Sequence, residues 1–484
     1  MRDFGPNGPS GELRATNWFV TTQSAPQRAK REPTPPPGSL DKLLATLAPL
    51  IATVLGEHPD ERTRRLPKAQ TLLLCVAMSV FRALSLDDLI RKLKLALPGS
   101  NGALGVASSS VTEARERLGV DPAIALFREV TKQVRAETSA ATSTWRGLLE
   151  LAVDGTTFRL PDVPALRAYF GAHTGPTGTP AAFPSLRLVV AMAIRSHVLV
   201  AAAIGGYPVG ELTLAAQLLS GLPERSLLLL DRGFVSMALL YNIHRHGGKR
   251  HWLTRIKKTT RYKKVRRLGP GDDEVEVTFS DEARKADPTL PLTMAARVLR
   301  VDCRGYRPFW VMTSMLDTNE FPAEDVRARY VGRWHVELGY REMKSGLLAH
   351  SPTLRSRTVE GVKQEMWAML VGYQCIRGNV QQAAHALGLD GCRVSFLSAL
   401  RMWQSAWVVK AWHPDEAVPK EMAQAWRRLE GMKLPAPRRG RRCPRVVRIR
   451  HNKFPHKAKY RPLSKKTRQA AKRRNPRFSQ TSVP

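Results

Sequence analysis

The sequence of 484 residues lacks the features that would place it in a membrane or a secretory pathway. It has no uninterrupted apolar run of about 18 residues, the length that a transmembrane helix needs. Its most apolar region, LRLVVAMAIRSHVLVAAAI, is interrupted by Arg195 and His197. The start, MRDFGPNGPSGELRATNWF, has no apolar core of the kind found in secretion signals. We therefore expect a cytoplasmic protein with no membrane partner.

Cysteine is also scarce, and its five residues are scattered along the chain. No two of them form a C-x-x-C pair, the spacing typical of many zinc sites. Their odd number argues against a disulfide framework. The sequence favours reduced thiols in the core or on the surface.

Acidic residues are few relative to basic ones. The 41 Asp and Glu residues face 77 Lys and Arg residues, which gives a net charge of +36 and makes nucleic acid the first candidate partner. The stretch 438–477 carries 18 basic residues and no acid, and the stretch 249–267 carries ten, with Trp252 and Tyr262 among them. Such stretches predict contacts with the DNA backbone. The candidates within the second stretch are Lys257, Lys258, Arg261, Lys263 and Lys264.

Changes in composition and hydrophobic period divide the chain into six segments. Pro, Gly, Ser and Thr dominate the first, helical periodicity the second, and apolar strands alternating with helices the third. Strand-like alternation then gives way to helices and finally to the basic tail. The segments are 1–39 (flexible tail), 40–140 (helical domain), 141–256 (mixed strands and helices), 257–316 (β-rich insertion), 317–400 (helical) and 401–484 (helical region and basic tail).

The helical segment 40–140 contains a short helix, a Gly/Ser/Asn loop and a second helix that bears Arg115 and Arg117. A helix-turn-helix-like DNA reader would give this pattern, and so would an ordinary pair of packed helices. Both interpretations stay open from the sequence alone.

Two aspartates stand where apolar strands end. Asp154 lies in WRGLLELAVDGTTFRL and Asp231 in SLLLLDRGF, and a glycine follows each within two residues. A carboxylate there projects from a rigid strand while the glycine lets a ligand approach, as a metal site requires. A common turn dipeptide is the alternative for either aspartate alone. The surrounding pattern predicts a mixed α/β domain of three layers.

The stretch ARYVGRWHVELGYREMK predicts one α-helix. Four polar residues fall within about 60° of one another around it, namely Tyr330, Arg333, Glu337 and Lys344. A separate apolar stripe is formed by Val331, Trp334 and Leu338. A surface helix with this apolar stripe toward the core and a solvated charged face would give the same pattern. Glu342 points away from the polar stripe, and we expect it in solvent.

If the strands of Asp154 and Asp231 are neighbours and this helix crosses beside them, Glu337 completes a carboxylate triad. Oxygen ligands at that count favour Mg²⁺ or Mn²⁺. Two such ions about 3.5–4 Å apart serve phosphodiester chemistry. Arg333 and Lys344 would then grip a phosphate, with Tyr330 as a further donor.

Together these motifs resemble the DDE transposases of bacterial insertion sequences, in the large group called insertion-sequence family four. The tetrad on the helix matches the group's Y-R-E-K signature, and DGT and DRGF resemble its first two acidic motifs. The resemblance covers about residues 40 to 379. It implies an α/β fold with an RNase H-like catalytic core, a β-rich insertion, an all-helical N-terminal domain and a helical, strongly basic C-terminal region. It also implies Asp154, Asp231 and Glu337 as catalytic ligands of two Mg²⁺ ions, with Mn²⁺ as a substitute.

The resemblance further implies cut-and-paste transposition by a homodimer on double-stranded DNA, bound at terminal inverted repeats and then at target DNA. Several relatives form a hairpin at the element's end and stack a flipped base on an aromatic residue of the insertion. Phe309 and Trp310 are the candidates here, in a register that the sequence leaves open, and core packing is expected for whichever faces inward. The alternative functions are a metal-dependent nuclease of the same fold and an inactive, domesticated DNA-binding protein.

Overall fold

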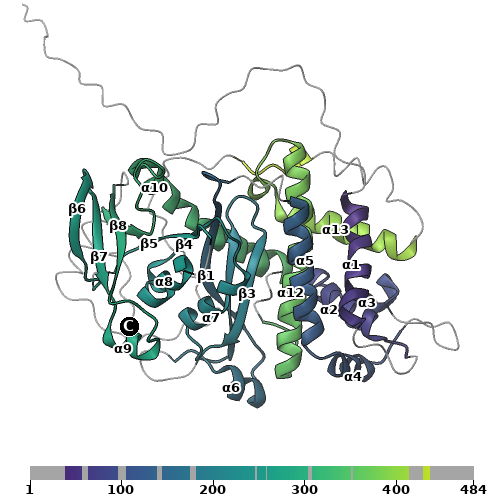
Figure 1. Cartoon of the computed structure of the whole chain (residues 1–484). Coiled ribbons are helices and arrows are strands. Elements are labelled where there is room, and N and C mark those ends of the chain that lie inside the picture. The colour runs from purple at the N-terminus through teal and green to yellow at the C-terminus, as the bar shows by residue number, and fades with distance from the viewer. Residues whose placement is uncertain are drawn as a thin grey trace, which may run out of the picture. The chain divides into compact units, whose positions relative to one another are not determined.

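A mixed β-sheet is the largest element of the computed structural model (Figure 1). The structure describes residues 39–56, 64–95, 105–138, 144–174, 181–245, 248–257, 259–302, 308–349, 351, 353–413 and 429–435. Within these residues nine strands pair in the order β3-β2-β1-β4-β5-β9-β8-β7-β6. The chain divides into two compact units, and the sheet belongs to the first, Met1–Leu434.

The strands of the sheet run in both directions. β1 is antiparallel to β2 and parallel to β4, β4 is parallel to β5, and the other neighbours pair antiparallel. Their bounds are β1 (Leu149–Arg159), β2 (Ser185–Ala193), β3 (Leu199–Gly206), β4 (Ser226–Leu230), β5 (His251–Arg255), β6 (Lys263–Gly269), β7 (Asp272–Thr278), β8 (Thr293–Val301) and β9 (Phe309–Thr313).

The continuous apolar run in β4 is explained by its burial on both faces of the sheet. All five of its residues are buried, because helices cover both faces of the sheet. Leu227 and Leu229 belong to one apolar cluster, and Leu228 and Leu230 belong to the other. Successive side chains of a strand point to opposite faces, so the sheet separates two cores.

Each face carries its own set of helices. α7 (Glu211–Gln217) and α8 (Met237–Arg245) contribute Leu214 and Leu240 to the smaller cluster. The larger cluster continues into α12 (Val359–Ala386) and α5 (Asp121–Thr138), which run side by side in Figure 1. The result is the helix–sheet–helix arrangement of three layers that the sequence predicted.

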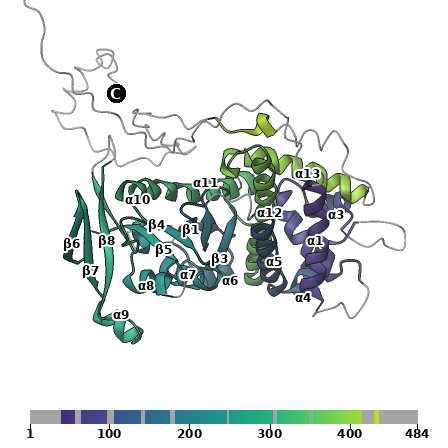
Figure 2. The ribbon, with the colours of Figure 1, turned by 45° about the horizontal axis from the view of Figure 1, so that its top comes forward.

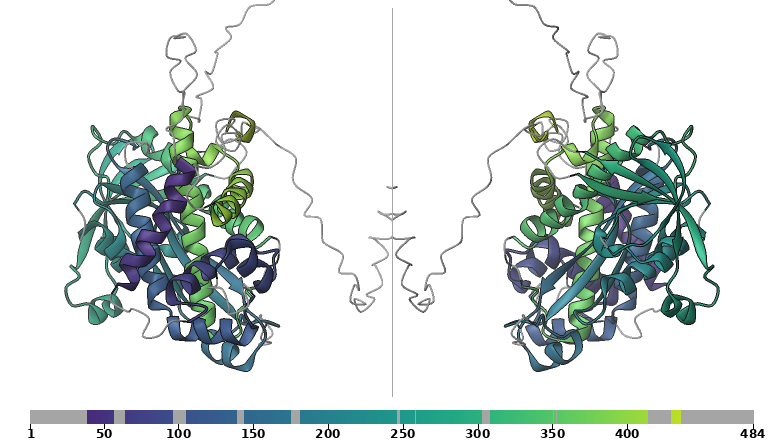
Figure 3. Two further views of the ribbon diagram at one scale, coloured as in Figure 1. Left: turned by 90° about the vertical axis from the view of Figure 1, so that its right-hand side faces the viewer. Right: turned by 90° about the vertical axis from the view of Figure 1, so that its left-hand side faces the viewer.

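The N-terminal helices share their core with α12. Leu72, Leu126 and Met366 all lie in the larger cluster, so α2, α5 and α12 bury one another. Figure 2 shows α12 between the sheet and these helices, and α1 runs alongside it in the side views of Figure 3. The remaining helices of this bundle are α1 (Ser39–Leu55), α2 (Lys68–Val80), α3 (Leu86–Leu93), α4 (Ser108–Leu118) and α13 (Phe396–Trp412).

Strands of the segment 257–316 extend the same sheet. β9 pairs with β5, with Thr313 opposite Leu253, and β8, β7 and β6 follow outward as an antiparallel meander. A short helix, α9 (Asp281–Ala286), interrupts the meander between β7 and β8. Arg297 of β8 is fully buried and donates two hydrogen bonds to Asp272 of β7, which joins the two strands by a satisfied internal ion pair.

The connection between β2 and β3 is longer than a tight two-residue hairpin turn. β2 ends at Ala193 and β3 begins at Leu199, so five residues, 194–198, form the connection. His197 takes a positive φ of 60° and is buried, so it leaves the strand pattern. Its imidazole needs polar partners inside the protein, and a strand conformation would not have provided them.

Candidate active site

Asp231 directly follows β4, and Asp154 lies beside it within the neighbouring parallel strand β1. The expected strand end at Asp154 is wrong, because β1 continues to Arg159 by pairing with β2. Val153 of β1 is paired with Leu230 of β4, and each aspartate is the next residue of its chain. Alternation along the strands puts both carboxylates on the face of the larger cluster. The neighbouring strands required by the predicted triad are therefore present.

A helix crosses this end of the sheet, as Figure 2 shows for α10 and α11. It is not the single regular α-helix that the sequence predicted. α10 (Ala323–Arg329) continues as a 3₁₀ helix, η4 (Tyr330–Trp334), then as α11 (His335–Arg341) and as a π-helix, η5 (Glu342–Leu347). Departures of this kind from α-helical geometry are often found at functional sites.

Gly332 gives the physical reason for the tightened turn. A Cβ atom there would lie 2.8 Å from Ile194 Cδ1 and 3.2 Å from Leu229 Cδ1. The backbone of η4 therefore approaches β4 more closely than a residue with a side chain would allow. This contact holds the helix against the strand that carries Asp231.

This helix buries polar residues and exposes apolar ones, which is the reverse of an ordinary surface helix. Tyr330 and Arg333 are buried, with 8% of each residue exposed. The apolar stripe faces solvent instead, with Trp334 58% exposed beside Val331 and Leu338. A solvated charged face over an apolar core is thus wrong for this stretch, because the acids of the neighbouring strands attract the arginine inward.

Arg333 lies between two carboxylates of the predicted triad. Its Nε is 3.8 Å from Asp231 Oδ1, and its Nη1 is 3.4 Å from Glu337 Oε1. About half of each carboxylate side chain is exposed, 46% for Asp231 and 43% for Glu337, whereas Arg333 is 10% exposed. The buried guanidinium thus holds two accessible acids around one positive charge.

Asp154 is the acid in the most buried surroundings of the site. The pKa of its carboxyl is raised to about 6, chiefly by burial and also by the charges of Asp231 and Glu211, against a hydrogen bond from the Gly155 amide and the charge of Arg333. That amide donates to Asp154 Oδ1 over 2.8 Å. Tyr340 donates its hydroxyl hydrogen to the backbone oxygen of Asp154 over 2.5 Å, so α11 is tied directly to β1.

Glu211 is an acid of this site that sequence reasoning missed. It opens α7 on the opposite face of the sheet, and a Cβ on Gly155 would lie 2.7 Å from its carboxyl carbon. In the sequence it is an unremarkable acid at a helix N-terminus, a common position for Glu. Only the packing of α7 against β1 brings it to the DGT motif.

Lys344, the last member of the tetrad, reaches the same strand. Its Nζ donates to Thr156 Oγ1 over 2.6 Å and lies 5.2 Å from the centre of the Phe158 ring. Burial lowers the pKa of its ammonium group. A groove of about 530 Å³ opens beside it, lined also by Arg159 and Phe183.

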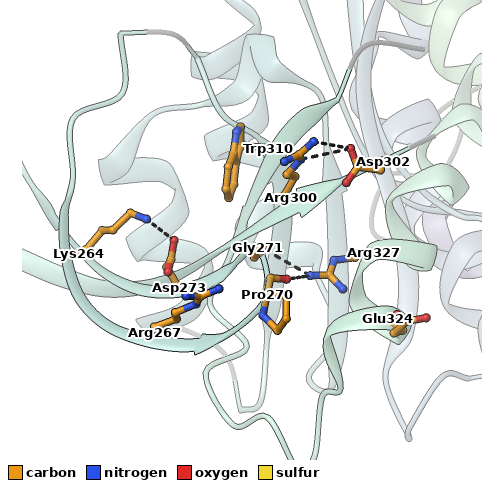
Figure 4. A pocket seen from close by; sticks show the side chains of 10 residues that line it. All are labelled: Lys264, Arg267, Pro270, Gly271, Asp273, Arg300, Asp302, Trp310, Glu324 and Arg327. Carbon is orange, nitrogen blue, oxygen red and sulfur yellow. Dashed lines mark hydrogen bonds and ion pairs between the residues drawn. The ribbon is translucent and has the colours of Figure 1, made fainter. Parts of the chain in front are cut away.

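The structure resolves the register of Phe309 and Trp310. Phe309 packs inward, with its ring centre 5.8 Å from that of Tyr330 and Arg255 4.8 Å above it. Trp310 points to the other face, where it lines a cavity of about 570 Å³ (Figure 4). Four basic and three acidic side chains line this cavity, and two ion pairs join them, Lys264 with Asp273 and Arg300 with Asp302. The other charged residues are Arg267, Arg327 and Glu324.

Two of the remaining DNA-contact candidates are held by intramolecular bonds. The Arg115 guanidinium donates to Gln364, Ser356 and the backbone oxygen of Gly361, which fixes α4 against α12. Lys257 donates to the backbone oxygen of Val235.

The others vary in exposure. Arg261 and Lys263 are exposed, Lys264 pairs with Asp273 at 2.7 Å, and Arg117 is 3.4 Å from the backbone oxygen of Leu66. Lys258 and the basic stretch 438–477 lie outside the described residues.

Glu342 is not in solvent as the sequence indicated. Its side chain is 16% exposed and accepts hydrogen bonds from Tyr373 and Arg377, the first over 2.9 Å. Burial acts to raise the pKa of this carboxyl, but the charges of Arg377 and His197 outweigh it and lower the pKa to about 2. The π-helical turn carries this acid inward, which an ideal helical wheel does not predict.

Comparison with known proteins identifies the family. Residues 145–375 match the model of a transposase DDE domain, and residues 39–128 match that of an insertion element 4 transposase N-terminal region. Transposase InsG for insertion sequence element IS4, from Escherichia coli (strain K12), is 35% identical over 410 residues, which cover 84% of this chain and 91% of InsG. The chain belongs to the IS4 transposase family.

Two weaker similarities accompany these. A putative transposase InsZ of the same strain is 37% identical over 199 residues, or 41% of this chain and 64% of InsZ. A solved synaptic complex of piggyBac transposase with hairpin DNA covers 83% of this chain and 84% of that one, at 12% identity and a TM-score of 0.32, which is too low to support an argument.

An IS4-family transposase is a DNA-cleaving and strand-transferring enzyme that binds DNA, and the DDE domain implies an RNase H-like core that uses divalent metal ions. The donor set fits such ions, because three carboxylates offer only hard oxygen ligands. Among the described residues, however, only His197, His335 and Cys392 bring three ligand atoms within 4.8 Å of one another. The three carboxylates stand farther apart, with Arg333 between two of them. In the part of the chain that the structure describes, no helix is long and apolar enough to cross a bilayer.

Proposed function

We propose that this transposase moves its element by a cut-and-paste reaction in which Asp154, Asp231 and Glu337 hold two Mg²⁺ ions, for which Mn²⁺ can substitute. The observation that carries the proposal is the position of the three acids. Two follow paired residues of parallel strands, and the third shares the Arg333 guanidinium with one of them. When bound, the ions would activate the attacking oxygen and stabilise the leaving oxygen.

The reaction uses two kinds of phosphoryl transfer, which are repeated until both strands at the element's end are cut and the end is joined to target DNA. In the first, a water oxygen bonds to phosphorus, the bond from phosphorus to the 3′ oxygen breaks, and the proton lost by water balances the one gained by the 3′ oxygen. In the second, the freed 3′-hydroxyl attacks a phosphorus of the other strand or of target DNA and releases a new 3′-hydroxyl. One bond forms and one breaks in each step, so no external energy source is required.

The polar side chains around the acids have separate roles in this proposal. Lys344 binds a phosphate beside Thr156, since its ammonium group is already held next to the DGT motif of β1. Arg333 orients Asp231 and Glu337 and offers its remaining N–H groups to the scissile phosphate. Tyr330 packs beside Arg333. Burial raises the pKa of the tyrosine hydroxyl, which therefore stays protonated.

Trp310 is the residue that we propose for stacking a flipped base. It lines a cavity of suitable size with basic residues around it, whereas Phe309 is occupied by Tyr330 and Arg255. Aromatic stacking accepts any base, and the basic side chains of the wall attract the accompanying phosphate. Exposed Arg261 and Lys263 on and beside β6 would extend this contact along the DNA backbone.

We further propose that two chains act together, each cutting one terminal inverted repeat. A joined pair of ends is needed before both can be inserted at one target. The test is to mix wild type with a Glu337→Gln variant at increasing ratios. Joining of paired ends should fall faster than the wild-type fraction itself, and a linear fall would contradict paired action.

The catalytic proposal is tested with DNA that carries the element's own ends. Wild type should nick and join these ends in Mg²⁺, and Glu337→Gln should bind the DNA with unchanged affinity but cleave at least about a thousandfold more slowly. Glu360→Gln, which changes an exposed acid on α12, is the matched control and should retain cleavage. Cleavage without any joining by the wild type would favour the nuclease function instead.

A further inference from the structure

A second group of ligand atoms lies on the same helix as Glu337 but outside the carboxylate site. It consists of His197 in the β2–β3 connection, His335 at the start of α11, and Cys392 in the 3₁₀ helix η6 (Gly391–Arg393). One ligand atom from each lies within 4.8 Å of the other two. Three segments that are distant in sequence thus converge at one point, which we name the His–Cys cluster.

Hydrogen bonding determines which nitrogen of His197 faces the cluster. Its Nδ1 lies 3.1 Å from Glu342 Oε1, and that carboxylate, held by Arg377 and Tyr373, can only accept. His197 Nδ1 therefore carries the hydrogen, and its Nε2 presents a lone pair. A carboxylate behind the distal nitrogen of a histidine is the usual support for a metal-binding imidazole.

The lone pair of His197 faces another histidine. His197 Nε2 lies 3.1 Å from His335 Nδ1, and the two rings meet at 66°. Either His335 donates a hydrogen bond to His197, or both nitrogens bind one cation. The thiol of Cys392 favours a bound cation, because its sulfur adds a third ligand atom at the point where the two nitrogens meet.

We propose that His197, His335 and Cys392 bind a Zn²⁺ ion that is distinct from the Mg²⁺ ions of the carboxylate site. Two imidazoles and a thiol are borderline and soft ligands, which favour zinc and disfavour magnesium. A water molecule would take the fourth position, as in zinc sites with three protein ligands.

The electrostatic surroundings allow this ion. An imidazole binds a metal in its neutral form, which is the ordinary state of a histidine above about pH 6.5. Burial raises the pKa of the Cys392 thiol to about 11, so zinc has to displace its proton. Two of the arginines nearby are paired with acids, Arg377 with Glu342 and Arg195 with Asp390, which limits their repulsion of a cation. A third, Arg393, donates an exposed hydrogen bond to the backbone oxygen of Leu434.

Zinc here would fix the beginning of α11, two residues before Glu337. It would tie that helix to the β2–β3 connection and to the segment between α12 and α13. This inference does not rest on the proposed mechanism, because the cluster contains none of the three catalytic acids.

The test measures metal content and coordination in the full-length protein. Purified without chelators, the wild type should carry about one zinc ion per chain by elemental analysis. After removal of the metal, addition of Co²⁺ should produce a thiolate-to-cobalt absorption band and the visible bands of a tetrahedral site. Both signals should persist in an Asp231→Asn variant, which separates this ion from the carboxylate site.

Cys392→Ser should reduce the zinc content to background and abolish the thiolate band, whereas Cys375→Ser, which removes another buried thiol, should retain both. His335→Gln keeps the cysteine and removes one imidazole, so it decides the outcome if Cys392→Ser fails to fold. Zinc at the level of a buffer blank in the wild type, or full zinc in the His335→Gln variant, would overturn the proposal.

Discussion

Lys344 Nζ donates a hydrogen bond to Thr156 Oγ1 over 2.6 Å and so joins the end of the catalytic helix to the DGT strand. Two motifs separated by 188 positions thus meet at one side-chain contact. Because the hydrogen-bond partner of Lys344 is a neutral hydroxyl, the charge of this partly buried ammonium group is available for a DNA phosphate.

Replacing Lys344 by Ala should slow cleavage by about 10- to 100-fold, the effect of losing one hydrogen bond to a charged group. The salt dependence of DNA binding should also become shallower by about one phosphate contact. Lys363→Ala is the control, since Lys363 pairs with Glu360 on α12. Cleavage at the wild-type rate by Lys344→Ala would remove Lys344 from the site.

The two motif glycines should respond differently to an added methyl group. Gly155→Ala places a Cβ 2.7 Å from the Glu211 carboxyl carbon, whereas a Cβ at Gly233 meets nothing within 4 Å. We expect Gly155→Ala to lose cleavage activity or stability and Gly233→Ala to behave like wild type. The double variant Gly155→Ala/Glu211→Ala should recover most of the loss, because the overlapping carboxylate is gone. Equal effects of the two single variants would contradict the packing of α7 on β1.

Trp310→Ala should weaken the capture of a flipped base by about 1–3 kcal/mol. A 2-aminopurine at the element's end reports the change, because its fluorescence rises on unstacking and is quenched again when it stacks on tryptophan. Phe309→Leu should leave this signal unchanged and lower thermal stability instead, since Phe309 packs on Tyr330. The reverse pattern would assign the base to Phe309.

Glu342→Gln should destabilise the fold by about 3–5 kcal/mol at neutral pH, because it leaves Arg377 buried without its counter-ion. The folded-state pKa of Glu342, about 2, lies below its ordinary value of 4.5. Its contribution is therefore complete above pH 4.5 and is lost as the pH falls toward 2. Denaturant unfolding should show the difference from wild type shrinking over that range, while exposed Glu360→Gln stays within about 0.5 kcal/mol throughout. A difference that does not change with pH would show that Glu342 is not ionised in the fold.

Much of the site was predictable because its signals are local. An apolar run that ends in Asp231 predicts a strand with an acid at its end, and the spacing of the tetrad identifies its helix. These patterns need no knowledge of distant contacts. The strand of Asp154 was also predicted, but not its continuation to Arg159, which depends on pairing with β2.

The failures concern partners that are distant in sequence. Glu342 faces inward because its hydrogen-bond partners Arg377 and His197 lie inside the protein. Glu211 reaches the site through the packing of α7 on β1. The exposed Trp334 has the same origin, since the acids of β1 and β4 draw Arg333 inward and turn the apolar stripe outward. A helical wheel contains no information about either strand.

The most direct test of the central claim, that the three acids hold the catalytic metal, is cleavage by an Asp231→Cys variant in Mg²⁺ and in Mn²⁺. Magnesium binds sulfur poorly, whereas manganese tolerates it better. We predict that this variant binds the element's ends normally, fails to cut them in Mg²⁺ and regains cleavage in Mn²⁺. Cleavage in Mg²⁺ at the wild-type rate would show that Asp231 is not a metal ligand and would contradict the account.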